Sequence, residues 1–378
     1  MANRGGFSVN PISVSGYYYS DDGGLTFTDG GQLPVNTGTS SISTTTYPQV
    51  FGDTDVKYAG GANFVMSSIM LKKISSSGTA QTLCVHRSTD YGHTWTGPFE
   101  ITAATNPTGA FSGANARDAA DKEFIDVDPS TGRVLVSWTN FEVNQSIRTS
   151  YSDNVFTANP PTWTTSAVIS PSGTGAPSGS QPRFSGNGTA AYVVFNDRGR
   201  TATDATGYSL NNVLFSKSAD NGATWTSPVL LTSDFAMLDQ VPGNDRVHSF
   251  PFISVDRTAV GSSTRGNIYV VWSQNTHGDG GDIAFCRSTD GGATFSAPVE
   301  INARPGNDRS QWFPTLTVDP GDGRIFITYF DQGIAASGDL TEVAVVTSTD
   351  GGVTFKRPQA LTAVPFNAGW GNDTSQPN

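Results

Sequence analysis

Short apolar runs separated by turn-forming residues recur along the whole chain. Typical runs are GRVLVSW, which ends at Trp138, GNIYVVW, which ends at Trp272, and GRIFITY, which ends at Tyr329. Runs of this length, rich in β-branched and aromatic residues and bounded by Gly, Asn or Asp, are typical of strands. The 42 Gly and 21 Pro strengthen this pattern, because both residues favour turns and disfavour helices. We predict an all-β protein with almost no helix.

One octet with the pattern S-x-D-x-G-x-T-aromatic recurs among these runs. Five copies are complete: SDDGGLTF at 20–27, STDYGHTW at 88–95, SADNGATW at 218–225, STDGGATF at 288–295 and STDGGVTF at 348–355. A degenerate sixth copy begins at Ser152, and successive copies then start 68, 64, 66, 70 and 60 residues apart. This spacing is typical of one four-stranded sheet with its loops, as in a propeller blade.

Each octet lies between two extended runs and is predicted to be the turn of a β-hairpin. Its Asp accepts backbone N–H groups, and the Gly at its fifth position supplies a positive φ; the aromatic residue packs between sheets. We therefore assign a structural role to Asp22, Asp90, Asp220, Asp290 and Asp350. The octet lacks the residue order of an EF-hand loop, so it does not predict calcium binding.

A second repeated element precedes the hairpins. Pro251 and Pro314 each stand five residues before an Asp, at Asp256 and Asp319. The same offset links Pro48 to Asp53, Pro182 to Asn187 and, with Glu in place of Pro, Glu123 to Asp128. A glycine turn and another strand follow each pair. We interpret these segments as the inner two strands of a blade and the hairpins as the outer two.

The octets resemble the Asp-box (BNR) repeat of the sialidase-like β-propellers, and they extend over nearly the whole chain. The resemblance implies six four-stranded antiparallel blades with the octet turns on one face. We predict one domain, 1–378. It starts with an outer hairpin at 7–35, continues with blades at about 45–105, 118–170, 178–233, 246–303 and 309–363, and ends with a closing strand that starts in 364–378.

The closing blade is predicted to be incomplete. The first hairpin has no inner strands before it, and GNDTSQP at 371–377 repeats the start of an inner strand just before the last residue. Truncation or processing of the chain is one explanation. The other is that a neighbouring subunit adds a strand to the exposed edge, which would cause self-association.

Charge and composition exclude several classes of function. The net charge is −11 and the pI about 4.7, so the chain repels nucleic acid and anionic lipid surfaces. No apolar run is long enough for membrane insertion. The first ten residues lack the apolar core of a signal peptide, but the Thr-, Asn- and Gly-rich loops favour an exported, extracellular or cell-surface protein. Cys84 and Cys286 fall in opposite blades, so both are expected to be free and buried.

Polar side chains gather where inner strands begin and second strands end, which in such blades is one face of the ring. Asp121, Glu123 and Asp331 are the candidate catalytic carboxylates, because paired carboxyl groups perform acid, base or nucleophile chemistry on glycans. Arginine binds carboxylates in a bidentate manner, and a Trp face can pack on a sugar ring. The predicted substrate-binding residues are Arg183, Arg246, Arg309, His248, Gln311, Trp312, Asp197 and Gln274.

Two functions stay open. The first is a glycan-active enzyme, of the glycosidase or polysaccharide-degrading kind. True exo-sialidase activity is not expected, since the chain lacks the F-R-I-P segment of that family. The alternative is a non-catalytic scaffold or module that binds carbohydrate or protein, in which the pairs Asp245/Arg246 and Asp308/Arg309 only cap turns. No cofactor is predicted; calcium stays an alternative because Asp residues cluster on this face.

Overall fold

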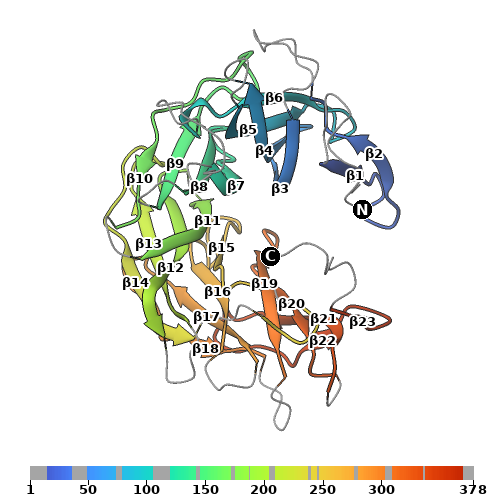
Figure 1. The fold of residues 1–378 in the computed structure, drawn as a ribbon, viewed down its shortest axis with the longest axis vertical. Helices are drawn as coiled ribbons and strands as arrows, with labels where there is room; N and C mark the ends of the chain where they lie inside the picture. Colours follow the sequence, from blue (N-terminus) through green and yellow to red (C-terminus); the bar gives the residue numbers. More distant parts are fainter. Residues whose placement is uncertain are drawn as a thin grey trace. The chain divides into compact units, whose positions relative to one another are not determined.

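The protein is an assembly of antiparallel strands (Figure 1). The computed structural model describes residues 15–35, 49–73, 79–104, 120–141, 145–171, 175–186, 188–203, 209–236, 240–244, 247–275, 280–302, 309–334 and 337–368. Within these ranges the only helix is the short 3-10 helix η1 (Thr102–Ala104). No described helix has the length and apolar character needed to cross a membrane. The all-β prediction is confirmed.

The strands belong to two compact units. Unit 1 comprises 1–173 and 218–225, and unit 2 comprises 174–217 and 226–378. The sheets of unit 1 are a hairpin of β1 (Gly16–Tyr19) and β2 (Thr28–Gln32), a sheet of β3 (Gln49–Tyr58), β4 (Phe64–Lys73), β5 (Thr79–Ser88) and β6 (Thr96–Glu100), and a sheet of β7 (Ala120–Val127), β8 (Val134–Asn140), β9 (Ser146–Ser152) and β10 (Ala167–Val168). The single ring-shaped domain stays a prediction.

Unit 2 contains three further sheets. The first consists of β11 (Ala176–Phe184), β12 (Ala191–Thr203), β13 (Ser209–Ser218) and β14 (Val229–Ala236), and the second of β15 (Phe252–Val255), β16 (Ile268–Gln274), β17 (Asp282–Ser288) and β18 (Val299–Glu300). The third consists of β19 (Gln311–Val318), β20 (Ile325–Asp331), β21 (Leu340–Ser348) and β22 (Gln359–Ala360), and β23 (Phe366–Asn367) also pairs with β21.

In every four-stranded sheet the strands lie side by side in chain order. This confirms the predicted order within each sheet, two strands followed by a hairpin, while the inner and outer positions of these strands in a ring stay a prediction. The fourth strand starts later than predicted, however: β18 and β22 have two residues each and begin directly after Pro298 and Pro358. Before each proline one ladder bond forms, as from Ser296 N–H to the Arg287 carbonyl at 2.8 Å. Proline then interrupts the ladder because it has no N–H to donate.

The octets form the predicted turns. In the fourth complete copy, Ser288 Oγ donates to Asp290 at 2.7 Å and accepts from Gly292 N–H at 2.9 Å, while Thr294 donates to Asp290 through its N–H at 2.9 Å and its hydroxyl at 2.5 Å. The corresponding Gly residues have φ between 78° and 94°. The hydrogen bonds from Thr side chain, Thr backbone and Ser hold the pKa of Asp90 and Asp220 at about 2. The octet is thus a folding device.

The degenerate sixth copy makes a similar turn with Asn154 in place of Asp. Asn154 Oδ1 accepts from Ser152 Oγ at 3.0 Å and from Thr162 N–H at 2.9 Å. The octet aromatics vary more in their burial: Trp95 is 9 % exposed, but Phe27 is 66 % exposed. The prediction that this residue packs between sheets is therefore wrong for Phe27.

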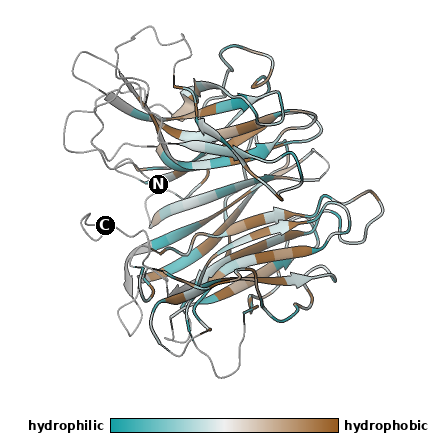
Figure 2. Ribbon diagram, turned by 90° about the vertical axis from the view of Figure 1, so that its right-hand side faces the viewer, coloured by the Kyte–Doolittle hydropathy of each residue, from teal (hydrophilic) through white to brown (hydrophobic). Residues whose placement is uncertain are grey.

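Apolar residues recur along the strands and fill the space between neighbouring sheets within each unit (Figure 2). The predicted large residues at second-strand ends are core residues, with Trp138 1 %, Trp272 0 % and Tyr329 2 % exposed. Cys84 and Cys286 are both buried and free, as predicted. Each cysteine thus serves as a small apolar core residue.

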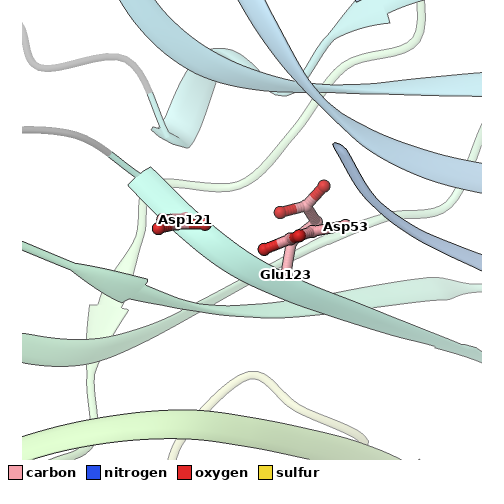
Figure 3. Close-up of side chains that lie close together, drawn as sticks. All are labelled: Asp53, Asp121 and Glu123. Atoms are coloured by element: carbon pink, nitrogen blue, oxygen red, sulfur yellow. The ribbon is translucent and has the colours of Figure 1, made fainter. Parts of the chain in front are cut away.

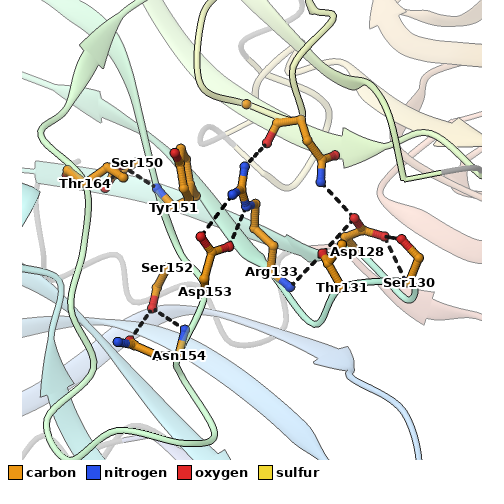
Figure 4. Close-up of polar contacts among 12 residues, drawn as sticks. Asp128, Ser130, Thr131, Arg133, Ser150, Tyr151, Ser152, Asp153, Asn154 and Thr164 are labelled. Carbon is orange, nitrogen blue, oxygen red and sulfur yellow. Dashed lines mark hydrogen bonds and ion pairs between the residues drawn. The ribbon is translucent and has the colours of Figure 1, made fainter.

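One arginine ties an octet turn to the neighbouring sheet of unit 1 (Figure 4). Arg133 binds the Asp153 carboxylate through Nε at 2.6 Å and Nη2 at 2.9 Å, and it donates to the Asn221 carbonyl at 2.9 Å. Its guanidinium lies 3.7 Å from the ring centre of Tyr151. Asn221 Nδ2 in turn donates to Asp128 at 2.8 Å. The planar fork of arginine makes all these contacts at once.

We expect Arg133→Lys to lower the free energy of unfolding by about 1 kcal/mol, since a lysine ammonium cannot reproduce the fork and the stacking. The expected loss of stability is small because Asp153 is 58 % exposed and solvent screens its ion pair with Arg133. Urea unfolding measures the change. Arg324→Lys is the control: Arg324 pairs with Asp322 at 3.3 Å at an exposed site, and an equal loss in both variants would contradict the prediction.

Candidate functional site

The first strands of two sheets in unit 1 carry β-bulges. The pairing register shifts between Phe51 and Asp55 in β3 and between Asp121 and Phe124 in β7. Asp53 and Lys122, inside these bulges, have φ of 45° and 55°. A bulge redirects side chains from the regular alternation of a strand. The bulges of β3 and β7 therefore decide where the polar residues at the start of these strands point.

Three carboxylates meet at these two bulges (Figure 3). One oxygen each of Asp53, Asp121 and Glu123 lies within 4.8 Å of the other two. The structure thus brings together two of the three predicted catalytic carboxylates. We call Asp53, Asp121 and Glu123 the acidic cluster.

Asp53 was not among the predicted site residues. The five-residue offset from Pro48 assigned it to the end of an inner strand, but β3 continues to Tyr58 and the turn position falls at Ala59, whose N–H donates to the Asn63 carbonyl at 2.9 Å. Asn187, assigned in the same way from Pro182, lies outside the described residues; in this sheet Ser185 N–H donates to the Ala190 carbonyl at 2.8 Å. The five-residue offset correctly predicts the turn position at Asp128, Asp256 and Asp319. The backbone N–H of each donates to a carbonyl directly before the following strand.

Glu123 is the least solvated member of the acidic cluster. Its side chain is 0 % exposed. Neither carboxylate oxygen accepts a hydrogen bond from another residue among those that the structure describes. Burial, with a smaller contribution from the charges of Asp53, Asp121 and Asp55, raises the pKa of Glu123 well above its usual value. Glu123 is therefore the member of the cluster whose charged form is most disfavoured by its surroundings.

Asp121 is the half-buried member, with 25 % of its side chain exposed. Its Oδ1 accepts from the Lys122 backbone N–H at 2.7 Å, and Lys122 Nζ lies 3.3 Å from its Oδ2. A second lysine, Lys57, binds Asp55, which also accepts from Ile125 N–H at 3.0 Å. Asp53 is exposed. A glycan from solvent can therefore reach Asp53 and Asp121 but not Glu123.

Asp331 belongs to a separate buried network in unit 2. Its Oδ1 accepts from Gln311 Nε2 at 3.0 Å and from Gly333 N–H at 2.6 Å. Asn302 Nδ2 donates to Gln311 at 2.6 Å and to Asp282 at 3.1 Å. Asp331 is 0 % and Gln311 2 % exposed. The structure thus joins these two predicted residues, as parts of the interior of the sheet.

Several predicted binding residues are held by their own neighbours. Arg183 donates to the Pro182 carbonyl at 2.7 Å, and Arg309 donates to Gln332 at 3.5 Å and to the Gly338 carbonyl. Gln274 accepts from Trp272 Nε1 at 3.0 Å. Arg246 lies outside the described residues, as do Asp245 and Asp308. Three arginines were predicted to bind the substrate. The two that the structure describes, Arg183 and Arg309, thus donate hydrogen bonds to other groups of the protein.

The remaining predicted binding residues are packed rather than presented to solvent. Trp312 is 2 % exposed, and its ring centre lies 5.5 Å from that of Phe330, so it offers no face to a sugar. His248 stacks on Phe250 at 3.7 Å. Asp197 is 8 % exposed and lies so close to Gly175 that a Cβ there would come 1.9 Å from its Oδ1. These side chains contribute mainly to packing in this structure.

No protein-family model matches the chain, and neither does any protein with a curated description. Solved structures match. An α-L-arabinofuranosidase from Fusarium graminearum is 14% identical, covers 89% of this chain and 86% of its own, and has a TM-score of 0.51. An ulvan lyase, described as a new family of polysaccharide lyase, is 9% identical, with 89% and 76% covered and a TM-score of 0.52.

A microbial sialidase also matches, at 15% identity and a TM-score of 0.45; 79% of this chain and 56% of the sialidase are covered. The arabinofuranosidase and the lyase are the two of these three structures with a TM-score above 0.5. They show that the chain shares the fold of β-propeller proteins built from repeated four-stranded sheets. Fold at such low identity does not define activity, which has to be argued from the site.

Proposed function

We propose that this protein is an exported, glycan-active β-propeller of the sialidase-like, Asp-box type. Six blades, one of them completed at the chain ends, would account for the six octets and the six sheets. Two structures with the same fold are described as an arabinofuranosidase and an ulvan lyase. The observation that carries the proposal is the acidic cluster, where carboxylates from two innermost strands come within 4.8 Å of one another.

In this proposal Asp121 is the catalytic carboxylate, because a bound glycan can reach it. Glu123, whose carboxyl group comes within 4.8 Å of that of Asp121 but is buried, is assigned the role of a positioning residue. Lys122 Nζ lies 3.3 Å from Asp121 Oδ2 and so helps to hold that carboxylate in place. A carboxylate at this position is suited to act as a base or nucleophile on a sugar. Asp331, which was also predicted as a catalytic carboxylate, is buried in unit 2 and accepts hydrogen bonds from Gln311 and Gly333, so it is not assigned a role at this site.

The test is a screen of the purified protein against acidic and neutral polysaccharides. Release of reducing ends detects hydrolysis, and ultraviolet absorbance of an unsaturated product detects elimination. We expect turnover on at least one glycan and a loss of at least about tenfold in kcat/KM for Asp121→Asn. Asp322→Asn, at an exposed ion pair, should leave kcat/KM unchanged. An unaltered kcat/KM in Asp121→Asn would contradict the assignment.

A second candidate is a non-catalytic module that binds carbohydrate or another protein. It is favoured by the complete burial of Glu123 and Asp331, which keeps two of the three predicted carboxylates from touching a glycan. Glycan binding without turnover in the same screen would support this alternative. The proposed strand exchange at 371–378 concerns residues outside the described part of the chain. It predicts oligomers that are lost when these residues are deleted.

A further inference from the structure

The carboxyl group of Glu123 is a buried polar group without hydrogen-bond partners among the described residues of unit 1. Its side chain is 0 % exposed, and no other described residue donates a hydrogen bond to either oxygen. Buried carboxylates are normally paired or fully hydrogen-bonded. Protonation alone does not resolve this, because a carboxylic acid needs an acceptor for its O–H and a donor for its carbonyl oxygen. A bound ion is one physical explanation for a buried polar group that has no hydrogen-bond partner.

The neighbouring lysines do not supply the missing partner. Lys122 Nζ lies 3.3 Å from Asp121 Oδ2, and Lys57 Nζ binds Asp55. Both ammonium groups are therefore directed to other carboxylates. Glu123 instead points toward Asp53 and Asp121 (Figure 3). Three carboxylates that converge on one point repel one another unless a positive charge lies between them.

The geometry of the acidic cluster fits a calcium-sized ion. Calcium takes six to eight oxygen ligands, carboxylates among them, in a flexible geometry, whereas magnesium usually keeps several waters and is held by one or two carboxylates. One oxygen each of Asp53, Asp121 and Glu123 lies within 4.8 Å of the other two, which is close enough for all three to contact one ion at Ca–O distances of about 2.3 to 2.6 Å. The all-oxygen ligand set favours a hard cation over zinc or copper, and the convergence of three carboxylates favours calcium over magnesium.

We propose that Asp53, Asp121 and Glu123 bind one divalent cation of the size of calcium. The ion joins the bulges of β3 and β7 and so ties two adjacent sheets of unit 1 together. Glu123 provides the deep ligand, Asp121 the half-buried one and Asp53 the exposed one. Water fills the remaining positions on the solvent side, where a sugar hydroxyl or carboxylate can replace it. The cation site itself does not depend on the proposed glycan activity.

The test uses the full chain, stripped of metal with a chelator and titrated with CaCl2 in a calorimeter. We expect one site per chain, tighter binding of Ca2+ than of Mg2+, and a rise in Tm of about 5 °C at a hundredfold excess over Kd. Glu123→Gln keeps the shape of the side chain and removes its charge. It should leave the Tm of the metal-free protein equal or higher, while it weakens Ca2+ binding by at least about tenfold.

Two further variants keep the result interpretable. Asp53→Asn changes an exposed ligand, and Asn tolerates the positive φ at this position, so the protein folds and Ca2+ binding should weaken. Glu300→Gln, on the exposed strand β18, is the matched control and should bind Ca2+ like the wild type. Absence of heat and of a Tm shift with CaCl2, or equal binding by wild type and Glu123→Gln, would overturn the proposal.

Discussion

Between pH 7 and pH 4, His86 is expected to lose about 3 kcal/mol of the stability that it contributes to the folded protein. His86 is 0 % exposed on β5. Its Nε2–H donates to the Pro34 carbonyl at 2.8 Å, and its Nδ1 has no partner among the described residues. Desolvation lowers its pKa from 6.5 to about 4, although the bond to Pro34 acts in the opposite direction. The folded protein thus holds this side chain neutral.

The loss of stability at low pH follows from the uptake of a proton by His86. The unfolded chain binds a proton at His86 below pH 6.5, whereas the folded chain does so only near pH 4. The unfolded state therefore binds more protons in this window, and acidification favours it. A difference of about 2.5 units corresponds to about 3 kcal/mol, more than a hundredfold in the folding equilibrium. Above pH 6.5 the effect is absent.

The measurement compares urea unfolding of wild type and His86→Gln at pH 7, 5.5 and 4. Taking the difference between the two proteins at each pH cancels the titration of other groups, such as the octet Asp residues. We expect the stability of the wild type relative to the variant to fall by about 3 kcal/mol as the pH falls. His93→Gln, at a side chain 41 % exposed, is the control. A pH-independent difference between wild type and His86→Gln would show that the prediction is wrong.

Gly352→Ala is expected to destabilise unit 2 by about 3 kcal/mol. Gly352 has a φ of 78°, which costs an alanine about 1 kcal/mol or more. A Cβ there would also lie 2.6 Å from Cζ of Phe285, a ring that is 1 % exposed and packs edge-on against Phe355 at 4.9 Å. Such contact forces the buried ring to move, which adds an overpacking cost.

Gly338→Ala separates the two causes. Gly338 lies in the same unit with a φ of 86°, but no atom lies within 4 Å of a Cβ built on it. This variant should lose only the backbone cost, about 1 kcal/mol. Chemical unfolding followed by circular dichroism gives both values. If the two variants lose the same free energy, close packing on Phe285 is not the reason for glycine at position 352.

The contact of Gly352 illustrates how much of the octet was predictable. Its hydrogen bonds join residues within a few positions of one another, so the sequence predicts the turn, its Asp and its positive φ. The packing partner lies in the preceding sheet and has no signal in the octet. Gly292 repeats the contact with Phe215, where a Cβ would lie 2.6 Å from the ring. A similar approach at Gly222 involves Leu135 at 3.4 Å.

The candidate site was predictable only in part. Asp121 and Glu123 follow from the repeat, because the position of Glu123 matches Pro314 at the start of another inner strand. Asp53 was missed, since the register shift in β3 places it away from the position that its spacing from Pro48 implies. The burial of Trp312 was missed as well. Bulges and burial depend on pairing between distant segments, which the local spacing does not record.

The sequence by itself determined the repeating part of this protein. Apolar periodicity and the octets predict strands, hairpins, their order within each sheet and two free cysteines, because these features depend on local hydrogen bonds and on a regular repeat. Tertiary structure alone decided which carboxylates meet. Asp53 joins Asp121 and Glu123 because the bulges of two separate sheets face the same point, and Glu123 is deprived of solvent and partners only when those sheets pack.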